Sequence, residues 1–313
     1  MLFSVKTYAK IYAQSSLIKK TSLFIAIFFI LLLLSACSMN ETQALPVVSD
    51  YMPEPVTEIK HLRVGVVSGP YKEMFEEAIL PSLEDMGYTA SFELYSDYES
   101  PNFALEQNVI DMNIFQHYAY LTAFKFENDL ALSAIIEIPT VSMSIFSKNI
   151  RSLEAIQTGV SISIPDDTSN LARALRVLEA AGMITLNSAI DKSKAIIDDV
   201  VLNPHRVQLI PLPAHELVDS LDLYDASIIP GNFAVSSGLD LSNALYREAL
   251  TENYKIVIAV RTGDLNKQFV RDIIGVLHSD NFREIITAPA GSYASFQLPR
   301  WLHDAMDSVR RTT

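Results

Sequence analysis

The chain has 313 residues, which is long enough for two domains and a large hydrophobic core. It carries 37 acidic and 24 basic residues, a formal net charge of −13, and a single cysteine. A surface this acidic disfavours binding to nucleic acid or to anionic lipid headgroups. One cysteine excludes an intrachain disulfide.

The first 36 residues have the layout of a bacterial lipoprotein signal peptide. A basic leader with four lysines precedes a continuous apolar run at 23–34, which is too short for a comfortable transmembrane helix. The run ends in Leu-Ser-Ala-Cys, and small residues before a cysteine resemble the lipobox. We therefore expect residues 1–36 to be cleaved and Cys37 to receive a diacylglyceryl group. The alternative is an uncleaved anchor helix with an incidental cysteine.

Residues 37–61 are expected to form a flexible tether. Segment 38–60 contains three prolines and several acids with little periodicity, a composition typical of a linker. Cleavage would remove four lysines and no acid, which leaves a net charge of −17. The lipid, not the surface charge, would then hold the protein at the membrane, on the extracytoplasmic side of the cell envelope.

From residue 62 onward, short apolar strands alternate with amphipathic helical stretches, which predicts an α/β fold with mainly parallel sheets. Pro81 is expected to kink the first helix and Gly87 to end it. Strands are expected at 62–67, 91–97, 109–115, 141–147, 160–165, 207–210, 226–229 and 254–261. Helices are expected at 72–87, 104–108, 169–181 and 266–278.

The sequence contains no motif of a known catalytic site. It has no G-x-S-x-G, G-x-G-x-x-G, P-loop or H-E-x-x-H, and no two of its six histidines are spaced for a helical metal site. No two of its carboxylates have a spacing in the sequence that indicates general acid–base catalysis. We therefore expect no enzyme, no metal and no cofactor.

One cluster of side chains follows the strand at 109–115. In Asn108–Leu121 (NVIDMNIFQHYAYL), three rings and a histidine lie at the end of the strand, and Tyr98 lies just upstream. Ligands bind beyond the carboxyl ends of parallel strands, and aromatic walls suit an apolar or thioether side chain. The alternative is that these rings only pack a helix onto its sheet. The candidate residues are Tyr98, Phe115, His117 and Tyr120.

A second cluster opens the helix expected at 169–181. Asp167 is a good N-cap candidate, and Asn170 and Arg173 lie in the first turn or so, beside free backbone N–H groups. Such a helix end attracts anions, and a guanidinium there binds a carboxylate through two hydrogen bonds. The alternative is a solvated Arg173 on the polar face. If Arg173 pairs only with a ligand, replacing it should leave the ligand-free stability unchanged.

Several motifs resemble the methionine-binding lipoproteins of ABC importers, the NlpA and MetQ family. VIDMN followed by FQHYAYL is similar to that family's D-I-D-A-N-x-F-Q-H-x-x-Y-L, and IPDDTSNLARAL to its V-P-N-D-P-T-N-x-x-R-x-L. DVVLNPHRVQLI is similar to D-V-V-x-N-P-x-x-L-x-I. VSGPY, SDYESPN and AGSYASFQLPRW occur in the family's order, so the likeness runs from Leu62 to Trp301.

The resemblance implies a two-lobed clamshell of the type II periplasmic-binding-protein class, crossed twice by the chain. One lobe would comprise 62–140 plus 240–313 and the other 141–239. By position in the motifs, the four residues of the aromatic cluster would surround a thioether chain, Arg173 would pair with the ligand carboxylate, and Asn170 would bind its polar end. The implied partners are methionine or a related amino acid, and an importer permease with its ATPase.

The chain departs from the family at one ligand position. The family reads V-I-N-G-N-Y-A where this chain has Ile228–Ala234 (IIPGNFA), so Pro230 replaces an asparagine that contacts ligand, and Asn232 is the asparagine that remains. Proline offers no N–H and no side-chain hydrogen bond. Two alternatives therefore stay open beside the importer receptor: a non-transport lipoprotein or receptor for another small ligand, and an enzyme on the same scaffold.

Overall fold

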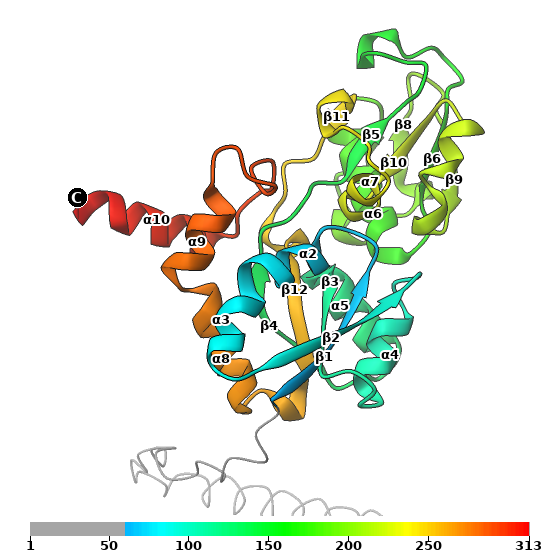
Figure 1. Cartoon of the computed structure of the whole chain (residues 1–313). Coiled ribbons are helices and arrows are strands. Elements are labelled where there is room, and N and C mark those ends of the chain that lie inside the picture. The colour runs from blue at the N-terminus through cyan, green and yellow to red at the C-terminus, as the bar shows by residue number, and fades with distance from the viewer. Residues whose placement is uncertain (1–59, 313) are drawn as a thin grey trace, which may run out of the picture. The chain divides into compact units, whose positions relative to one another are not determined.

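The computed structural model describes residues 60–312 (Figure 1). The predicted signal peptide, Cys37 and nearly all of the predicted tether lie outside the described residues. The described part has an α/β fold with two lobes, each built on a five-stranded sheet flanked by helices.

The first sheet has the strand order β2-β1-β3-β12-β4. Its bounds are β1 His61–Val67, β2 Thr89–Tyr95, β3 Met112–His117, β4 Leu132–Ile138 and β12 Ile256–Arg261. Strands β1, β2 and β3 pair in parallel, whereas β12 runs antiparallel to both β3 and β4. Four of the five strands therefore share one direction, which agrees with the predicted mainly parallel sheet.

Helices cover both faces of this sheet, and β12 shows why. Its alternating side chains divide between two apolar clusters: Ile256, Ile258 and Val260 join one, while Val257 and Ala259 join the other. Figure 1 shows helices on the two faces that these clusters fill. Their bounds are α2 Tyr71–Met74, α3 Leu80–Asp85 and α8 Gln268–Leu277 on one face, and α4 Ser100–Glu106 and α5 Tyr118–Glu127 on the other.

The first helical segment is irregular just before its proline, as expected. A π-helical turn, Phe75–Ile79, lies between α2 and α3, and Pro81 follows two residues later. Proline lacks the N–H of the regular helical ladder, and π-helical turns accompany such bends. Gly87, with φ +85°, follows the end of the segment as expected.

The second sheet has the order β11-β5-β10-β6-β9. Its bounds are β5 Ser144–Phe146, β6 Ser161–Pro165, β9 Gln208–Leu212, β10 Ala226–Ile229 and β11 Tyr246–Arg247. Only β5 opposes the direction of the others. Two helices associate with this sheet, α6 Thr168–Ala180 and α7 Gly231–Ser236, and a small hairpin joins β7 Thr185–Leu186 to β8 Val200–Leu202.

The chain passes between the sheets twice. The first crossover joins β4 to β5, and the second joins β11 to β12. Because β11 still pairs with β5, the second sheet extends beyond the boundary expected after residue 239, and the return comes after Arg247.

Gln297 ties the two crossovers together. Its backbone exchanges two hydrogen bonds with Thr140, at 2.9 and 3.1 Å. Its side-chain amide donates to the backbone oxygen of Glu248 and to Ser142 Oγ, and its Oε1 accepts from the N–H of Leu250. The segment after α9 therefore forms part of the hinge.

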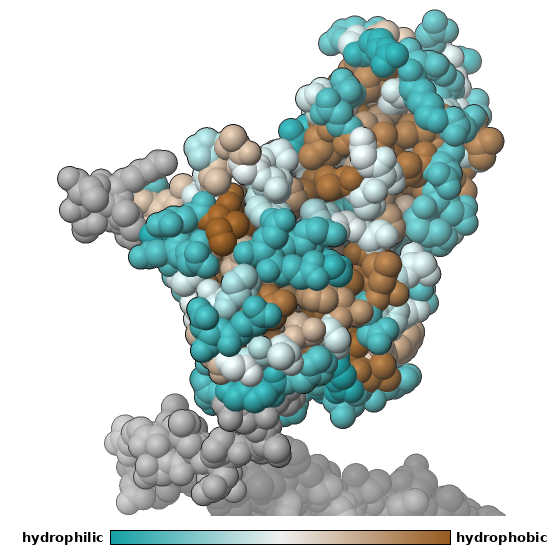
Figure 2. Space-filling view, viewed as in Figure 1, coloured by the Kyte–Doolittle hydropathy of each residue, from teal (hydrophilic) through white to brown (hydrophobic). Residues whose placement is uncertain are grey.

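The remaining helices are α9 Asp280–Thr287 and α10 Arg300–Thr312. Trp301 of α10 packs against Phe282 and donates its indole N–H to the backbone oxygen of Glu137 in β4. Within 60–312, no helix combines the length and apolarity needed to cross a bilayer. Figure 2 shows a mainly hydrophilic lower lobe in this view and apolar side chains gathered on the upper lobe.

Candidate ligand-binding cleft

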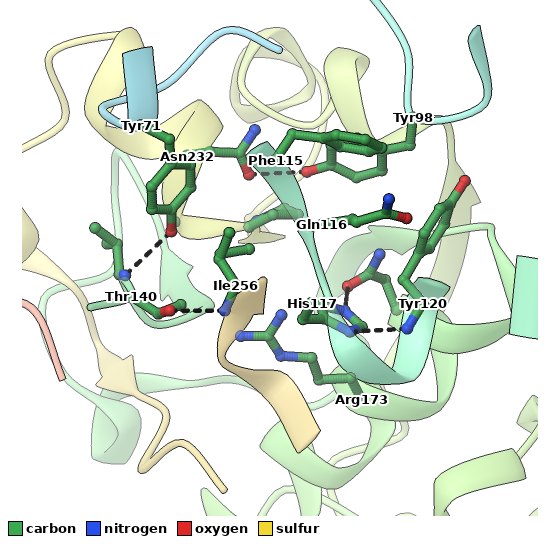
Figure 3. Close-up of a pocket in the computed structure, with 14 residues that line it drawn as sticks. Tyr71, Tyr98, Phe115, Gln116, His117, Tyr120, Thr140, Arg173, Asn232 and Ile256 are labelled. Carbon is green, nitrogen blue, oxygen red and sulfur yellow. Dashed lines mark hydrogen bonds between the residues drawn. The ribbon is translucent and has the colours of Figure 1, made fainter. Parts of the chain in front are cut away.

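A cavity lies between the two lobes, beside the first crossover (Figure 3). The lining atoms leave room for only about one water molecule. The lobes are therefore closed on each other. The lining residues are Tyr71, Tyr98, Phe115, Gln116, His117, Tyr120, Thr140, Val141, Asn170, Arg173, Pro230, Gly231, Asn232 and Ile256.

All seven residues predicted to bind ligand line this cavity. Tyr98, Phe115, His117 and Tyr120 come from the first lobe, and Asn170, Arg173 and Asn232 come from the second. Two segments distant in sequence, 98–120 and 170–232, are thus brought together. Contact of these side chains with a ligand stays a prediction.

Stacked and edge-on rings form one wall of the cavity. Tyr98 stacks on Phe115 with centroids 5.8 Å apart and meets Tyr120 edge-on at 5.7 Å. Phe233 of α7, which the motif comparison did not single out, lies 5.5 Å from Tyr98. Tyr120 of α5 also meets Phe115 of β3 edge-on, with centroids 6.4 Å apart, so the same rings pack the helix onto its sheet. The two interpretations of this cluster are therefore compatible.

His117 ends β3 and caps the next helix. Its Nδ1 accepts the backbone N–H of Tyr120, which places the proton on Nε2, and Nε2 donates to Asn170 Oδ1 at 3.0 Å. Burial, and next the positive charge of Arg173, lower the pKa of His117 to about 3. The imidazole is neutral at pH 7 and joins the two lobes.

Asp167 orients Asn170. The Asp167 carboxylate accepts both the backbone N–H and the side-chain Nδ2 of Asn170, at 2.9 to 3.2 Å. This capping contact turns the Oδ1 of Asn170 toward His117. Burial raises the pKa of the Asp167 carboxyl, although the hydrogen bonds from Asn170 oppose the shift.

Asn232 joins the lobes a second time. Its Oδ1 accepts the hydroxyl of Tyr98 at 2.8 Å, and its Nδ2 donates to the backbone oxygen of Ser68 at 3.0 Å (Figure 3). Gly69 permits the close approach, because a Cβ built there would lie 2.7 Å from Asn232 Cβ.

Arg173 is neither solvated nor unpaired. It is 4% exposed, and both oxygens of Glu248 accept from Nε at 3.0 Å while Nη2 donates to one of them at 2.6 Å. The ring of Tyr254 lies 5.0 Å from the guanidinium carbon. Burial opposes the charge, but Glu248 outweighs it, so the pKa of Arg173 lies above its ordinary value. The solvated alternative is therefore wrong.

Glu248 and Tyr254, both in the second crossover, were not predicted. They lie 75 and 81 residues after Arg173 in the sequence. The spacing of residues within either segment does not indicate that the second crossover contacts α6. The only sequence signal is that Tyr254 and Glu248 precede a strongly apolar strand, by two and eight residues.

Pro230 and Gly231 bring α7 against the first crossover. Pro230, with φ −56° and ψ 139°, is the N-cap residue of α7. A Cβ built on Gly231 would lie 2.6 Å from Val141 Cγ1 and 2.7 Å from the backbone oxygen of Ser142. A residue with a Cβ would clash at this contact, so position 231 requires glycine.

Comparison with known proteins places these features in a family context. Residues 62–301 match the profile of the family described as NlpA lipoprotein. The chain is 30% identical to the methionine-binding lipoprotein MetQ of Bacillus subtilis, covering 72% of this chain and 84% of the relative. It is 28% identical to the D-methionine-binding lipoprotein MetQ of Escherichia coli K12, covering 72% and 83%.

Solved structures agree with the fold. A nutrient binding protein from Burkholderia cenocepacia bound to methionine has a TM-score of 0.68 and 28% identity, covering 72% of this chain and 95% of that one. A periplasmic substrate-binding protein of an ABC transporter from Coxiella burnetii has a TM-score of 0.69 and 33% identity, covering 76% and 99%.

Proposed function

Because the chain belongs to the NlpA lipoprotein family, we propose that it is the substrate-binding lipoprotein of an ABC importer and binds methionine or a closely related amino acid between its lobes. The observation that carries the proposal is a buried guanidinium, Arg173, beside a wall of aromatic rings in a closed cavity. The guanidinium suits a carboxylate, and the rings suit a thioether chain.

The polar end of the ligand would lie near the second lobe. Asn170 Oδ1 accepts from His117, and Asn232 Oδ1 accepts from Tyr98. Each amide oxygen has a second lone pair, which is suited to an ammonium group. Relatives whose names state that they bind methionine support this ligand class.

The membrane anchor and the importer partners rest on sequence alone. We propose that Cys37 carries the lipid and that a permease with its ATPase receives the ligand. Radiolabelled palmitate should enter the wild type but not Cys37→Ser; equal labelling of the two would remove the anchor from the proposal.

Titration calorimetry of the purified protein with the twenty amino acids tests the ligand. We expect saturable binding of methionine and little binding of charged amino acids, because the cavity is lined by rings and by one cation that Glu248 already pairs. Tight binding of an amino acid that lacks an apolar side chain, with none of methionine, would contradict the proposal.

Pro230→Asn is expected to tighten methionine binding by about tenfold, the worth of one hydrogen bond to a charged group. Pro230 lines the cavity, and its backbone angles are ones that asparagine readily adopts at an N-cap. Pro230→Ala is the matched control, because it removes the ring without adding a partner, and it should not tighten binding. Unchanged affinity for Pro230→Asn would mean that the new amide caps α7 instead of meeting the ligand.

A further inference from the structure

We infer that Glu248 determines the net charge of the ligand: by neutralising Arg173 from outside the cavity, it makes the cleft select a zwitterionic amino acid over a simple carboxylate. This inference rests on the proposed function, since it concerns the same cleft. Glu248 is not among the residues that line the cavity.

The geometry holds Glu248 firmly against Arg173. The side chains are 10% and 5% exposed, and the carboxylate occupies the edge of the guanidinium formed by Nε and Nη2. The same carboxylate accepts the N–H of Met143 at 3.3 Å, and the backbone oxygen of Glu248 accepts from Gln297. Both crossovers and the C-terminal segment thus fix its position.

Tyr254 restricts the guanidinium further. Its ring lies against Arg173, while its hydroxyl accepts from Arg176 Nη1 at 2.9 Å. Arg173 lines the cavity (Figure 3), and because Glu248 takes Nε and Nη2, we take Nη1 as the nitrogen left to meet a ligand. A ligand carboxylate would bind at that end and would not displace Glu248.

The charges of Arg173 and Glu248 then balance, while Asp167, which accepts from Asn170 outside the lining, adds no positive charge. Arg173 is the only cation that lines it, since burial keeps His117 neutral, and no aspartate or glutamate lines it. With Glu248 in place, the pair carries no net charge. A ligand that brings both a carboxylate and an ammonium adds none, whereas a carboxylate alone would leave an unbalanced buried negative charge.

Replacing Glu248 should therefore shift the preference toward anions. The full-length chain and Glu248→Gln are titrated with L-methionine and with 4-(methylthio)butanoate, which has the same thioether chain and carboxylate but no amine. We expect the affinity ratio of methionine to 4-(methylthio)butanoate to fall by at least about tenfold in Glu248→Gln, because a full charge is removed from a poorly screened site.

Two further variants test whether the effect is due to the charge of Glu248 or to the loss of any acidic charge from the second crossover. Glu248→Asp keeps the charge and should keep the wild-type ratio. Glu252→Gln removes the same charge from the same crossover, where Glu252 accepts from the N–H of Arg300, and should also leave the ratio unchanged. If Glu248→Gln does not fold, the wild type still tests the inference, because it must bind methionine more tightly than 4-(methylthio)butanoate and equal affinities would overturn it.

The outcomes distinguish the two proposals. Wild-type binding of methionine with an unshifted ratio in Glu248→Gln, or a ratio shifted equally by Glu252→Gln, would overturn the inference and leave the proposed function standing. Absence of methionine binding in the wild type would overturn the proposed function and the inference with it.

Discussion

Arg173→Ala is expected to weaken methionine binding by about two to three orders of magnitude. Removing one partner of a buried, hydrogen-bonded charge pair costs about 2–5 kcal/mol, and each 1.4 kcal/mol is a tenfold change in affinity. Calorimetry of wild type and variant measures the loss. Wild-type affinity in the variant would show that the ligand carboxylate does not bind Arg173.

The same substitution should also destabilise the ligand-free protein. Arg173 is the only cation that pairs with Glu248 among the described residues, so Arg173→Ala leaves that carboxylate buried and unpaired, at a cost of about 3–5 kcal/mol. Sequence alone predicted unchanged stability, because Glu248 could not be foreseen. Urea unfolding of the ligand-free forms measures this effect.

A double variant separates binding from stability. Arg173→Met combined with Glu248→Gln removes both charges while keeping similar volumes, and an uncharged pair of this kind is often as stable as the ion pair it replaces. We expect most of the stability to return and methionine binding to stay lost. Recovery of binding together with stability would mean that Arg173 only supports the fold.

Methionine binding is expected to weaken by roughly 30-fold between pH 7.5 and pH 5, because of His117. In the closed form its pKa is about 3, well below the ordinary value of 6.5. The closed form therefore binds fewer protons than an open form in which His117 reaches water. The stabilising contribution is complete above about pH 6.5 and is lost as the pH falls from there toward 3.

Other charged groups near His117 call for a matched control. Arg173 stays charged throughout this range, and Asp167, whose pKa is raised, shifts the balance in the opposite direction. His117→Gln retains both groups, so its affinity should vary less between pH 7.5 and pH 5 than that of the wild type. Exposed His303→Gln should behave as wild type. Identical profiles for wild type and His117→Gln would contradict the assignment.

The parts of the fold that follow local rules were predictable. The strand at 226–229 was placed at its observed bounds, and the helix expected at 169–181 is α6, at 168–180, because a capping aspartate and a regular apolar stripe mark it. Strand β4 was missed, because its pattern of buried and exposed residues does not alternate cleanly. Helix α5 was also missed, since its N-cap is a histidine rather than one of the usual capping residues.

Some residues of the candidate site could also be predicted from the sequence, and others could not. Residues on contiguous motifs, such as His117 and Arg173, were singled out because spacing within one segment places them at a strand or helix end. Tyr71 and Ile256, which line the cleft, and Glu248, which reaches it only through Arg173, were not, because these contacts form only after both lobes and both crossovers have assembled. Contacts between segments more than 70 residues apart leave no periodic trace in the sequence.

The narrowness of the closed cavity has a kinetic consequence. The cavity itself has room for only about one water molecule, so an amino acid can enter or leave it only when the lobes part. Parting breaks three hydrogen bonds that join one lobe to the other, which are His117–Asn170, Tyr98–Asn232 and Asn232–Ser68. We expect the residence time of the ligand to depend on how often these bonds open together, and under the proposed function an importer would have to shift that equilibrium toward the open form.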